Sequence, residues 1–379
     1  MNILYSFNKT GFEANYWTTE IQAASDDDYT FIPFNHEPYL SPWKYIRAQL
    51  LDNLYYERHP GLMRLYGNFE KMLSTHKISV ILVDTCPPYH PDYLRQFSQY
   101  KVLRIGDGPI SAYDRDFAYC HAYDHVLYHS PAYSRDLDIA EKLRYCKVER
   151  SDFWPMCAFD ALFDQNRTEE TILSHDRDID VIFIGTLHIS KMPLLAQIKR
   201  GLGSRIVMRG LAPLKNNLYF NVKYGFPGWM RPVPFGSYVP LYQRSKIGIN
   251  LHNRGDYTVG SYRLFDLPAN GVMQISDGGS FLSAFYEVDK EIVSYASVDE
   301  LIDKVRYYLD HPEERNTIAS NGYKRVMKEY RHKTLMRRAG EIISRGIHEK
   351  NSQSDNMTYP CSSIPSSSIP RTAGKLAAL

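Results

Sequence analysis

Residues 178–185 read DIDVIFIG, a nearly continuous apolar run that ends in glycine. A strand of a parallel sheet has this composition because helices bury it on both faces. Apolar residues at helical spacing follow over residues 192–202. The stretch therefore predicts the first strand and helix of an α/β domain in the second half of the chain.

Similar short apolar runs recur on both sides of this stretch. In the second half they predict strands over residues 205–208, 247–251, 272–276 and 292–295, with helices over 298–309 and 313–330. In the first half they predict strands over residues 3–7, 30–34, 80–84, 102–105 and 126–129, with helices over 43–56 and 62–73. Strands that alternate with helices indicate an α/β fold of two Rossmann-like, doubly wound domains facing across a cleft.

The chain length and local composition suggest where these domains begin and end. A chain of 379 residues is too long for one ordinary core. A polar run over residues 165–170 separates the halves, so we predict an N-terminal domain over residues 1–160 and a C-terminal domain over residues 161–349. Residues 350–379 are Ser/Pro-rich and are expected to be a disordered tail with vector-encoded residues. Residues 211–239, dense in Gly, Pro and aromatics, are expected to form an irregular functional loop.

Charge and cysteine content narrow the partners and the compartment. The 45 basic and 43 acidic residues look interspersed, which argues against a nucleic-acid partner. The five cysteines form no CxxC pair, and neither a signal peptide nor eighteen consecutive apolar residues is present. We therefore expect a cytoplasmic protein without a transmembrane segment, and peripheral contact with a membrane surface stays open.

The richest group of polar residues lies between two predicted strands, at residues 249–277. A helix that begins near Ser261 would aim its backbone N–H groups at a preceding crevice, where a diphosphate can bind. Arg263 would add a charge-assisted hydrogen bond, and Asp266, on nearly the same helical face, could hold ribose hydroxyls. The alternative is that Arg263 and Asp266 only pair with each other on a surface helix. His252 could touch the bound phosphate or a sugar attached to it, or it could bond to the backbone at the end of its strand.

These residues resemble a known family. Asn250-Leu251-His252, the pattern Arg263-x-Phe265-Asp266-x-x-Ala269-x-Gly271 and the predicted C-terminal helices are similar to the CgeB-type (spore maturation protein) group of GT-B glycosyltransferases, with a group 1-like C-terminal domain. Residues 182–186 resemble the first strand and glycine turn of that domain. Residues 106–109, Gly-Asp-Gly-Pro, resemble the family's Asp-Asp-Pro signature, with Gly106 in place of its first Asp.

The resemblance implies roles for individual residues. Asp266 would contact the donor ribose, Arg263 and the amides near Ser261 would face the diphosphate, and Gly185 would allow close approach to the backbone. Many retaining GT-B enzymes carry a second carboxylate where this chain has Thr258, so the stereochemistry stays open. The expected catalytic residues are His252, Arg263 and Asp107. The expected donor-binding residues are Gly185, Thr186, Arg209, His252, Gly260, Ser261, Tyr262, Arg263 and Asp266.

Other polar residues are weaker candidates. The histidines of the first half that could deprotonate an acceptor are His36, His90, His121 and His125, with Asp84 and Asp107 beside them. Lys191 follows the Gly185 turn, and we expect its side chain to be solvated. Asp178-Ile179-Asp180 precedes its strand, unlike a metal-binding Asp-x-Asp, so no metal and no cofactor is expected.

The predicted function is glycosyl transfer from a nucleoside diphosphate-sugar, which serves as co-substrate, to a hydroxyl acceptor. Residues 1–160 would then be the acceptor-binding domain, and residues 161–349 the nucleotide-sugar-binding domain. The acceptor could be a glycan, a lipid-linked glycan or a small molecule. Two alternatives remain at this point: a nucleotide-sugar epimerase of the same fold, and a non-catalytic sugar-binding protein of a coat or surface layer.

Overall fold

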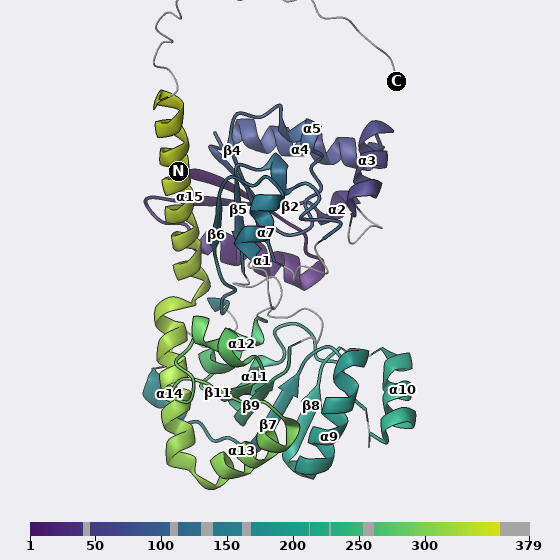
Figure 1. Cartoon of the computed structure of the whole chain (residues 1–379), viewed down its shortest axis with the longest axis vertical. Helices are drawn as coiled ribbons and strands as arrows, with labels where there is room; N and C mark the ends of the chain where they lie inside the picture. The colour runs from purple at the N-terminus through teal and green to yellow at the C-terminus, as the bar shows by residue number, and fades with distance from the viewer. Residues whose placement is uncertain are drawn as a thin grey trace, which may run out of the picture.

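The structure is a computed structural model that describes residues 1–40, 46–106, 113–129, 139–160, 168–211, 213–226, 229–252 and 261–356. It contains two parallel β-sheets, one in each half of the chain, and each sheet is covered by helices (Figure 1). The predicted fold class is confirmed.

The first sheet has six strands in the order β2-β1-β3-β4-β5-β6, all parallel. Every residue of β3 is buried, as its uninterrupted apolar sequence predicts. The strands are β1 (Asn2–Phe7), β2 (Thr30–Asn35), β3 (Val80–Val83), β4 (Tyr100–Ile105), β5 (His125–Tyr128) and β6 (Ser151–Phe153), the last of which the sequence analysis missed. The helices are α1 (Gly11–Ala23), α2 (Glu37–Leu40), α3 (Ala48–Tyr56), α4 (Pro60–Thr75), α5 (Pro91–Leu94), η1 (Cys120–Ala122) and α7 (Ile139–Tyr145).

The second sheet has five parallel strands in the order β11-β10-β9-β7-β8. Its strands are β7 (Ile179–Ile184), β8 (Ile206–Arg209), β9 (Ser245–Asn250), β10 (Met273–Ser276) and β11 (Val293–Ser294). Its helices are α8 (Glu169–Leu173), η3 (Ile189–Lys191), α9 (Met192–Leu202), η4 (Gly203–Arg205), α10 (Leu214–Tyr224), α11 (Val239–Gln243), α12 (Arg263–Ala269), η5 (Gly279–Ala284), α13 (Val298–Asp310) and α14 (Pro312–Glu329). The stretch that opened the sequence analysis thus forms β7, between β9 and β8.

Two predicted segments differ from the structure. The stretch 211–239 is not wholly irregular, because it contains the eleven-residue helix α10. Asn217 and Phe220 lie on the buried face of this helix. Packing against the rest of the domain therefore stabilises a helix that the sequence pattern alone does not indicate. Helix α3 begins at Ala48 rather than at residue 43, and residues 43–45 of the predicted helix lie outside the described residues.

The last helix, α15 (His332–Asn356), follows the second domain in sequence but packs along the first (Figure 1). The indole Nε1 of Trp154 donates to the carbonyl oxygen of Leu335 at 2.7 Å, and Arg337 bonds to Asp26 and Asp28 at 2.8 and 2.9 Å. The prediction of a disordered tail over residues 350–379 is therefore wrong at its start, because helix α15 continues to residue 356. The domain boundary at residues 160 and 161 stays a prediction, because residues 161–167 lie outside the described part.

Candidate functional site

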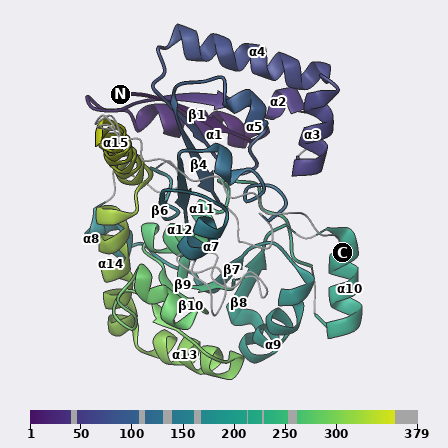
Figure 2. The same ribbon diagram turned by 45° about the horizontal axis from the view of Figure 1, so that its top comes forward.

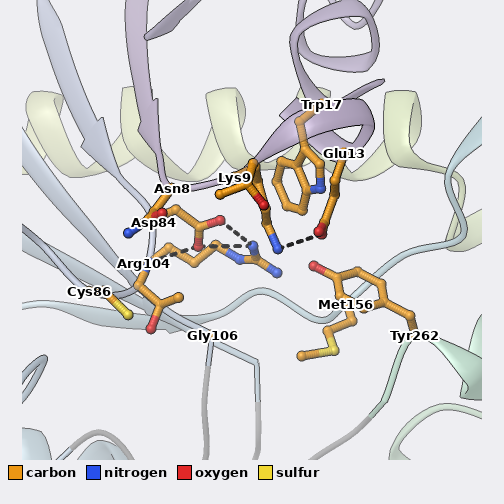
Figure 3. A pocket seen from close by; sticks show the side chains of 12 residues that line it. Asn8, Lys9, Glu13, Trp17, Asp84, Cys86, Arg104, Gly106, Met156 and Tyr262 are labelled. Atoms are coloured by element: carbon orange, nitrogen blue, oxygen red, sulfur yellow. Dashed lines mark hydrogen bonds and ion pairs between the residues drawn. The ribbon is translucent and has the colours of Figure 1, made fainter. Parts of the chain in front are cut away.

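A pocket of about 300 Å³ lies where the two domains meet (Figure 3). Its walls come from the segments that follow β1, β3 and β4 and from α1, and Tyr262 closes it from the second domain. The carboxyl ends of parallel strands are where α/β proteins bind ligands, because the loops there are free of sheet contacts. The pocket is therefore a candidate binding site on the first domain.

The charged side chains of this pocket neutralise one another. The Nη1 atom of Arg104 donates to both oxygens of Asp84 at 3.0 and 3.1 Å, and both side chains are buried. Lys9 Nζ lies 2.8 Å from Glu13 Oε1, and Figure 3 shows both pairs pointing into the same space. Arg104 also lies over the Trp154 ring at 4.8 Å. Each of these cations thus has a carboxylate of its own.

Arg263 lies against the end of β7 in the second domain. Its Nη1 atom donates to the carbonyl oxygen of Ile184 at 2.6 Å, and its guanidinium lies 5.3 Å from the centre of the Phe183 ring. A Cβ atom on Gly185 would come within 2.6 Å of the same Nη1, so the glycine makes room for the arginine. Burial lowers the pKa of Arg263, against the opposing effects of Tyr242, Asp277 and Asp266.

Lys191 is the residue that the sequence analysis misjudged. We expected a solvated side chain, but Lys191 is only 5% exposed, at the end of the 3-10 turn η3. Burial, and then the positive charge of Arg263, lower its pKa to about 7, although Asp277 acts in the opposite direction. Within the described residues, its ammonium group has no ion pair or hydrogen bond. Two cations, the buried Lys191 and the partly buried Arg263, therefore lie close enough for their charges to interact.

His252 is held by a carboxylate at the carboxyl ends of β9 and β10. Its Nδ1 atom lies 2.6 Å from Asp277 Oδ1, and its backbone N–H donates to the same carboxylate at 3.0 and 3.1 Å. This bond to a carboxylate differs from the expected bond to backbone, and contact of His252 with a donor stays a prediction. Nearby, the Ser261 hydroxyl donates to Asn250 Oδ1 at 3.2 Å, which ties the segment before α12 to the end of β9.

Asp266 is 3% exposed and lies on the buried face of α12. Tyr238 donates its hydroxyl to Asp266 Oδ2 at 3.3 Å, while Oδ1 is buried and has no hydrogen-bond partner within the described residues. Burial raises the pKa of this carboxyl to about 8, although Tyr238 and Arg263 pull it down. Asp266 and Arg263 bond to different partners, so the surface-pair alternative is wrong.

The other predicted donor residues are scattered. Thr186 is exposed, and Arg209 donates to the carbonyl of its neighbour Met208 at 2.9 Å. Tyr262 does not join Arg263, because its ring lines the first-domain pocket and lies 5.1 Å from the centre of the Phe159 ring. Gly260 and Asp107 lie outside the described residues, as does Thr258.

None of the candidate histidines of the first half lines the pocket. His36 is fully buried against Ser6, with its Nδ1 atom 2.9 Å from the hydroxyl, and burial lowers its pKa to about 3. His90 caps α5 and lies 3.1 Å from Asp52, while His125 lies 2.9 Å from Asp152. These three side chains serve packing. Of the expected carboxylates, Asp84 does line the pocket.

Two general features of the described residues bear on the chemistry. They contain no cluster of three or more His, Cys, Asp and Glu side chains that could hold a metal ion. In the same part of the chain, no helix has the length and apolar character needed to cross a membrane.

Comparisons with known proteins agree with the fold of two parallel-sheet domains described above. A family model described as glycosyl transferase-like matches residues 194–343. Sucrose-phosphate synthase from Thermosynechococcus elongatus superposes with a TM-score of 0.64 at 13% identity, over 92% of this chain and 100% of that one. Anabaena HepE in complex with UDP gives a TM-score of 0.54 at 10% identity, over 91% and 100% of the two chains.

A putative UDP-N-acetylglucosamine 2-epimerase from Listeria monocytogenes is also similar, with a TM-score of 0.53 at 12% identity over 92% of this chain and 97% of that one. No curated protein sequence matches the chain. At these identities the structural likeness establishes the fold, which is GT-B. The family match shows a glycosyl transferase group 1-like domain within the second half.

Proposed function

We propose that this protein is a glycosyltransferase that moves a sugar of the hexose type from a nucleoside diphosphate donor to a hydroxyl acceptor. The donor binds the second domain and the acceptor binds the pocket on the first. The observation that carries the proposal is a pair of neighbouring cations, the buried Lys191 and the partly buried Arg263, of which Arg263 lies against Gly185. A buried positive charge is costly without a counterion, and a diphosphate would supply two or more negative charges at this point.

The cations also suggest how the reaction is accelerated. When the bond between the sugar C1 and the diphosphate oxygen breaks, negative charge grows on the leaving diphosphate. Lys191 and Arg263 are held in place before the reaction, so they can stabilise that charge without reorganising. The acceptor oxygen forms the new bond to C1 and loses its proton. Protein cations at this position allow the chemistry to proceed without a protein-bound metal.

Asp266 supports the assignment of the nucleotide's ribose to this domain. Its Oδ1 atom is buried without a partner among the described residues, which is costly unless a ligand bonds to it. With a pKa raised to about 8, the carboxyl is largely protonated at neutral pH and can both donate to and accept from a pair of hydroxyl groups. Its position in the CgeB-like pattern supports the same role. The free cysteines among the described residues fit the cytoplasmic location that we propose.

The proposal is tested by nucleotide binding to matched variants. We expect nucleoside diphosphates to raise the melting temperature, nucleoside monophosphates to do so less, and nucleosides least, since the second phosphate meets the cation pair. A ligand at a hundred times its Kd adds about 2.7 kcal/mol of stability. Arg263→Ala and Lys191→Ala should each weaken diphosphate binding at least about tenfold. Lys246→Ala is the control, because Lys246 on β9 already pairs with Asp180 at 2.6 Å.

A second measurement separates the transferase from its alternatives. Incubation of the preferred nucleotide-sugar with and without hydroxyl acceptors should give a glycosylated product only with an acceptor. Conversion of the donor sugar without any acceptor would identify an epimerase. Tight nucleotide-sugar binding with neither outcome would identify a sugar-binding protein, and no response to any diphosphate would refute the donor site.

A further inference from the structure

Helix α10 presents an apolar stripe to solvent. Leu214, Leu218 and Val222 follow one another at four-residue spacing on one face, and they are 70%, 51% and 86% exposed. Leu211 before the helix and Trp229 after it are 65% and 49% exposed. Single exposed leucines are common on protein surfaces, but a continuous stripe marks an interaction site. We call these five residues the α10 stripe.

The opposite face of α10 is firmly attached to the domain, so the stripe is not the result of a misplaced helix. The backbone N–H of Met230 donates to Asn217 Oδ1 at 3.1 Å, and Phe220 stacks on Phe226 with ring centres 4.2 Å apart. Figures 1 and 2 both place α10 at the outer edge of the second domain, beyond α9. The helix therefore has a fixed inner face and an unpartnered outer face among the described residues.

Basic residues lie directly beside the apolar stripe. Lys215, Tyr219 and Lys223 form a second row one position further round the helix, and all three are exposed. Lys223 Nζ donates to the Tyr219 hydroxyl at 2.5 Å and lies 5.0 Å from the centre of its ring. The stem of such a lysine can cover apolar surface while its charged end reaches a polar layer.

The sequence around α10 has an unusual charge. Residues 181–255 contain eleven Lys and Arg and no Asp or Glu, although the whole chain has a net charge of only +2. The expectation of interspersed charges is therefore wrong for this part of the chain. A protein surface with this bias attracts anionic surfaces and repels cationic ones.

We propose that the α10 stripe, flanked by Lys215 and Lys223, docks the second domain on an anionic lipid surface. A helix with leucine and valine on one side and lysines and a tyrosine beside them, followed by a segment with an exposed tryptophan, has the composition of a helix that lies in the plane of a bilayer interface. A nucleic acid would use the lysines but would leave the leucines exposed. A membrane uses both, and contact at the interface needs no spanning helix.

The full chain tests this by cosedimentation with lipid vesicles. We expect it to sediment with vesicles of phosphatidylcholine mixed with phosphatidylglycerol, and to do so much less with phosphatidylcholine alone. The double variant Leu218→Glu with Val222→Glu should lose at least about tenfold in partitioning, because charged side chains enter an apolar layer poorly. Tyr145→Glu is the control, since Tyr145 is a 71% exposed aromatic residue on α7 of the other domain and should not matter.

The charges are tested separately with Lys215→Gln and Lys223→Gln. Each should weaken binding to the anionic vesicles about fivefold and leave binding to neutral vesicles unchanged, because each lysine near an anionic surface contributes about 1 kcal/mol. The variants replace solvent-exposed residues, so their melting temperatures and nucleotide responses should equal those of the unmodified chain.

Three results would overturn the proposal. The first is an unmodified chain that stays in the supernatant with anionic vesicles. The second is a double glutamate variant that binds as well as the unmodified chain, which would assign the attraction to charge alone. The third is self-association that the glutamates abolish, measured by sedimentation velocity without lipid, because a second copy would then cover the stripe. Nucleotide binding is measured independently, so loss of the lipid site leaves the donor site untouched.

Discussion

The two domains differ in whether their positively charged side chains have carboxylate partners. In the first-domain pocket, Arg104 is paired with Asp84 and Lys9 with Glu13. In the second domain, the buried Lys191 and the partly buried Arg263 form no ion pair with a carboxylate among the described residues. A neutralised pocket suits an uncharged, hydroxyl-rich acceptor, whereas an uncompensated pair of cations suits a diphosphate. The difference teaches that charge balance, more than shape, distinguishes two domains with similar sheets.

Asp84→Ala should have the largest effect, because it removes the charge balance that distinguishes the first domain from the second. This change leaves the Arg104 charge buried and unpaired, and we expect a loss of about 3–5 kcal/mol in the free energy of unfolding. Urea denaturation measures it. Adding Arg104→Met should restore most of the stability, because an apolar side chain then replaces the orphaned charge. A single variant as stable as the unmodified protein would mean that the pair contributes nothing.

The uncompensated pair predicts that nucleotide affinity depends on pH. With a pKa of about 7 in the free protein, Lys191 is charged below pH 7 and must take up a proton to bind a diphosphate above it. Affinity should therefore fall as pH rises from 7 to 9, by up to about tenfold per pH unit, in a range above the terminal phosphate's own pKa of about 6. Calorimetry at several pH values measures this. Lys191→Met should bind weakly with a nearly flat profile, and an equally steep profile in that variant would assign the proton elsewhere.

Asp266→Asn sharpens the comparison from the acidic side. The folded carboxyl has a pKa of about 8, above its unfolded value of about 4, so its stabilising effect is present below pH 4 and is lost as pH rises toward 8. The asparagine variant lacks this loss, and its melting temperature should exceed that of the unmodified protein at pH 7 but not at pH 4. The gain should be on the order of 1 kcal/mol per pH unit. If Asp266 bonds to ribose, the same variant binds nucleotides more weakly while being more stable.

Glu13→Gln should have the smallest effect. The Lys9 and Glu13 side chains are 27% and 33% exposed, so water screens their attraction, and Lys9 keeps its position 5.0 Å over the Trp17 ring. We expect a loss below about 1 kcal/mol in urea denaturation. A loss as large as that of Asp84→Ala would show that water does not screen the Lys9–Glu13 pair any more than it screens the buried Arg104–Asp84 pair.

The strands were predictable because residues buried on two faces must be apolar over their whole length, as in β3 and β7. Helix α10 was not predictable, because its three asparagines and the glycines and prolines near it are weak helix formers. Its support comes from contacts outside the helix, such as that of Asn217 with Met230, thirteen residues further along the chain. The position of Gly185 after β7 and that of Asp266 on a short helix between two strands were predicted from the sequence, although the roles of both residues stay predictions.

Lys191 could not be found from spacing. Burial and the charge of Arg263 lower its pKa, but Arg263 is more than seventy residues away in sequence, and no local pattern records that proximity. The acid-free stretch over residues 181–255 was the signal available, since it removes the carboxylates that would otherwise neutralise both cations. A count of charges over the entire chain conceals this stretch.

Helix α15 sets the order in which the molecule matures during translation. Its Leu335, Met336, Ala339, Ile342 and Ile343 belong to the same buried cluster as Ile3 and Tyr5 of the first strand. The ribosome therefore releases the opening domain long before the piece that closes its core. Until residues 332–356 emerge, the first domain has an uncovered apolar face, and the same late helix then completes both halves of the protein.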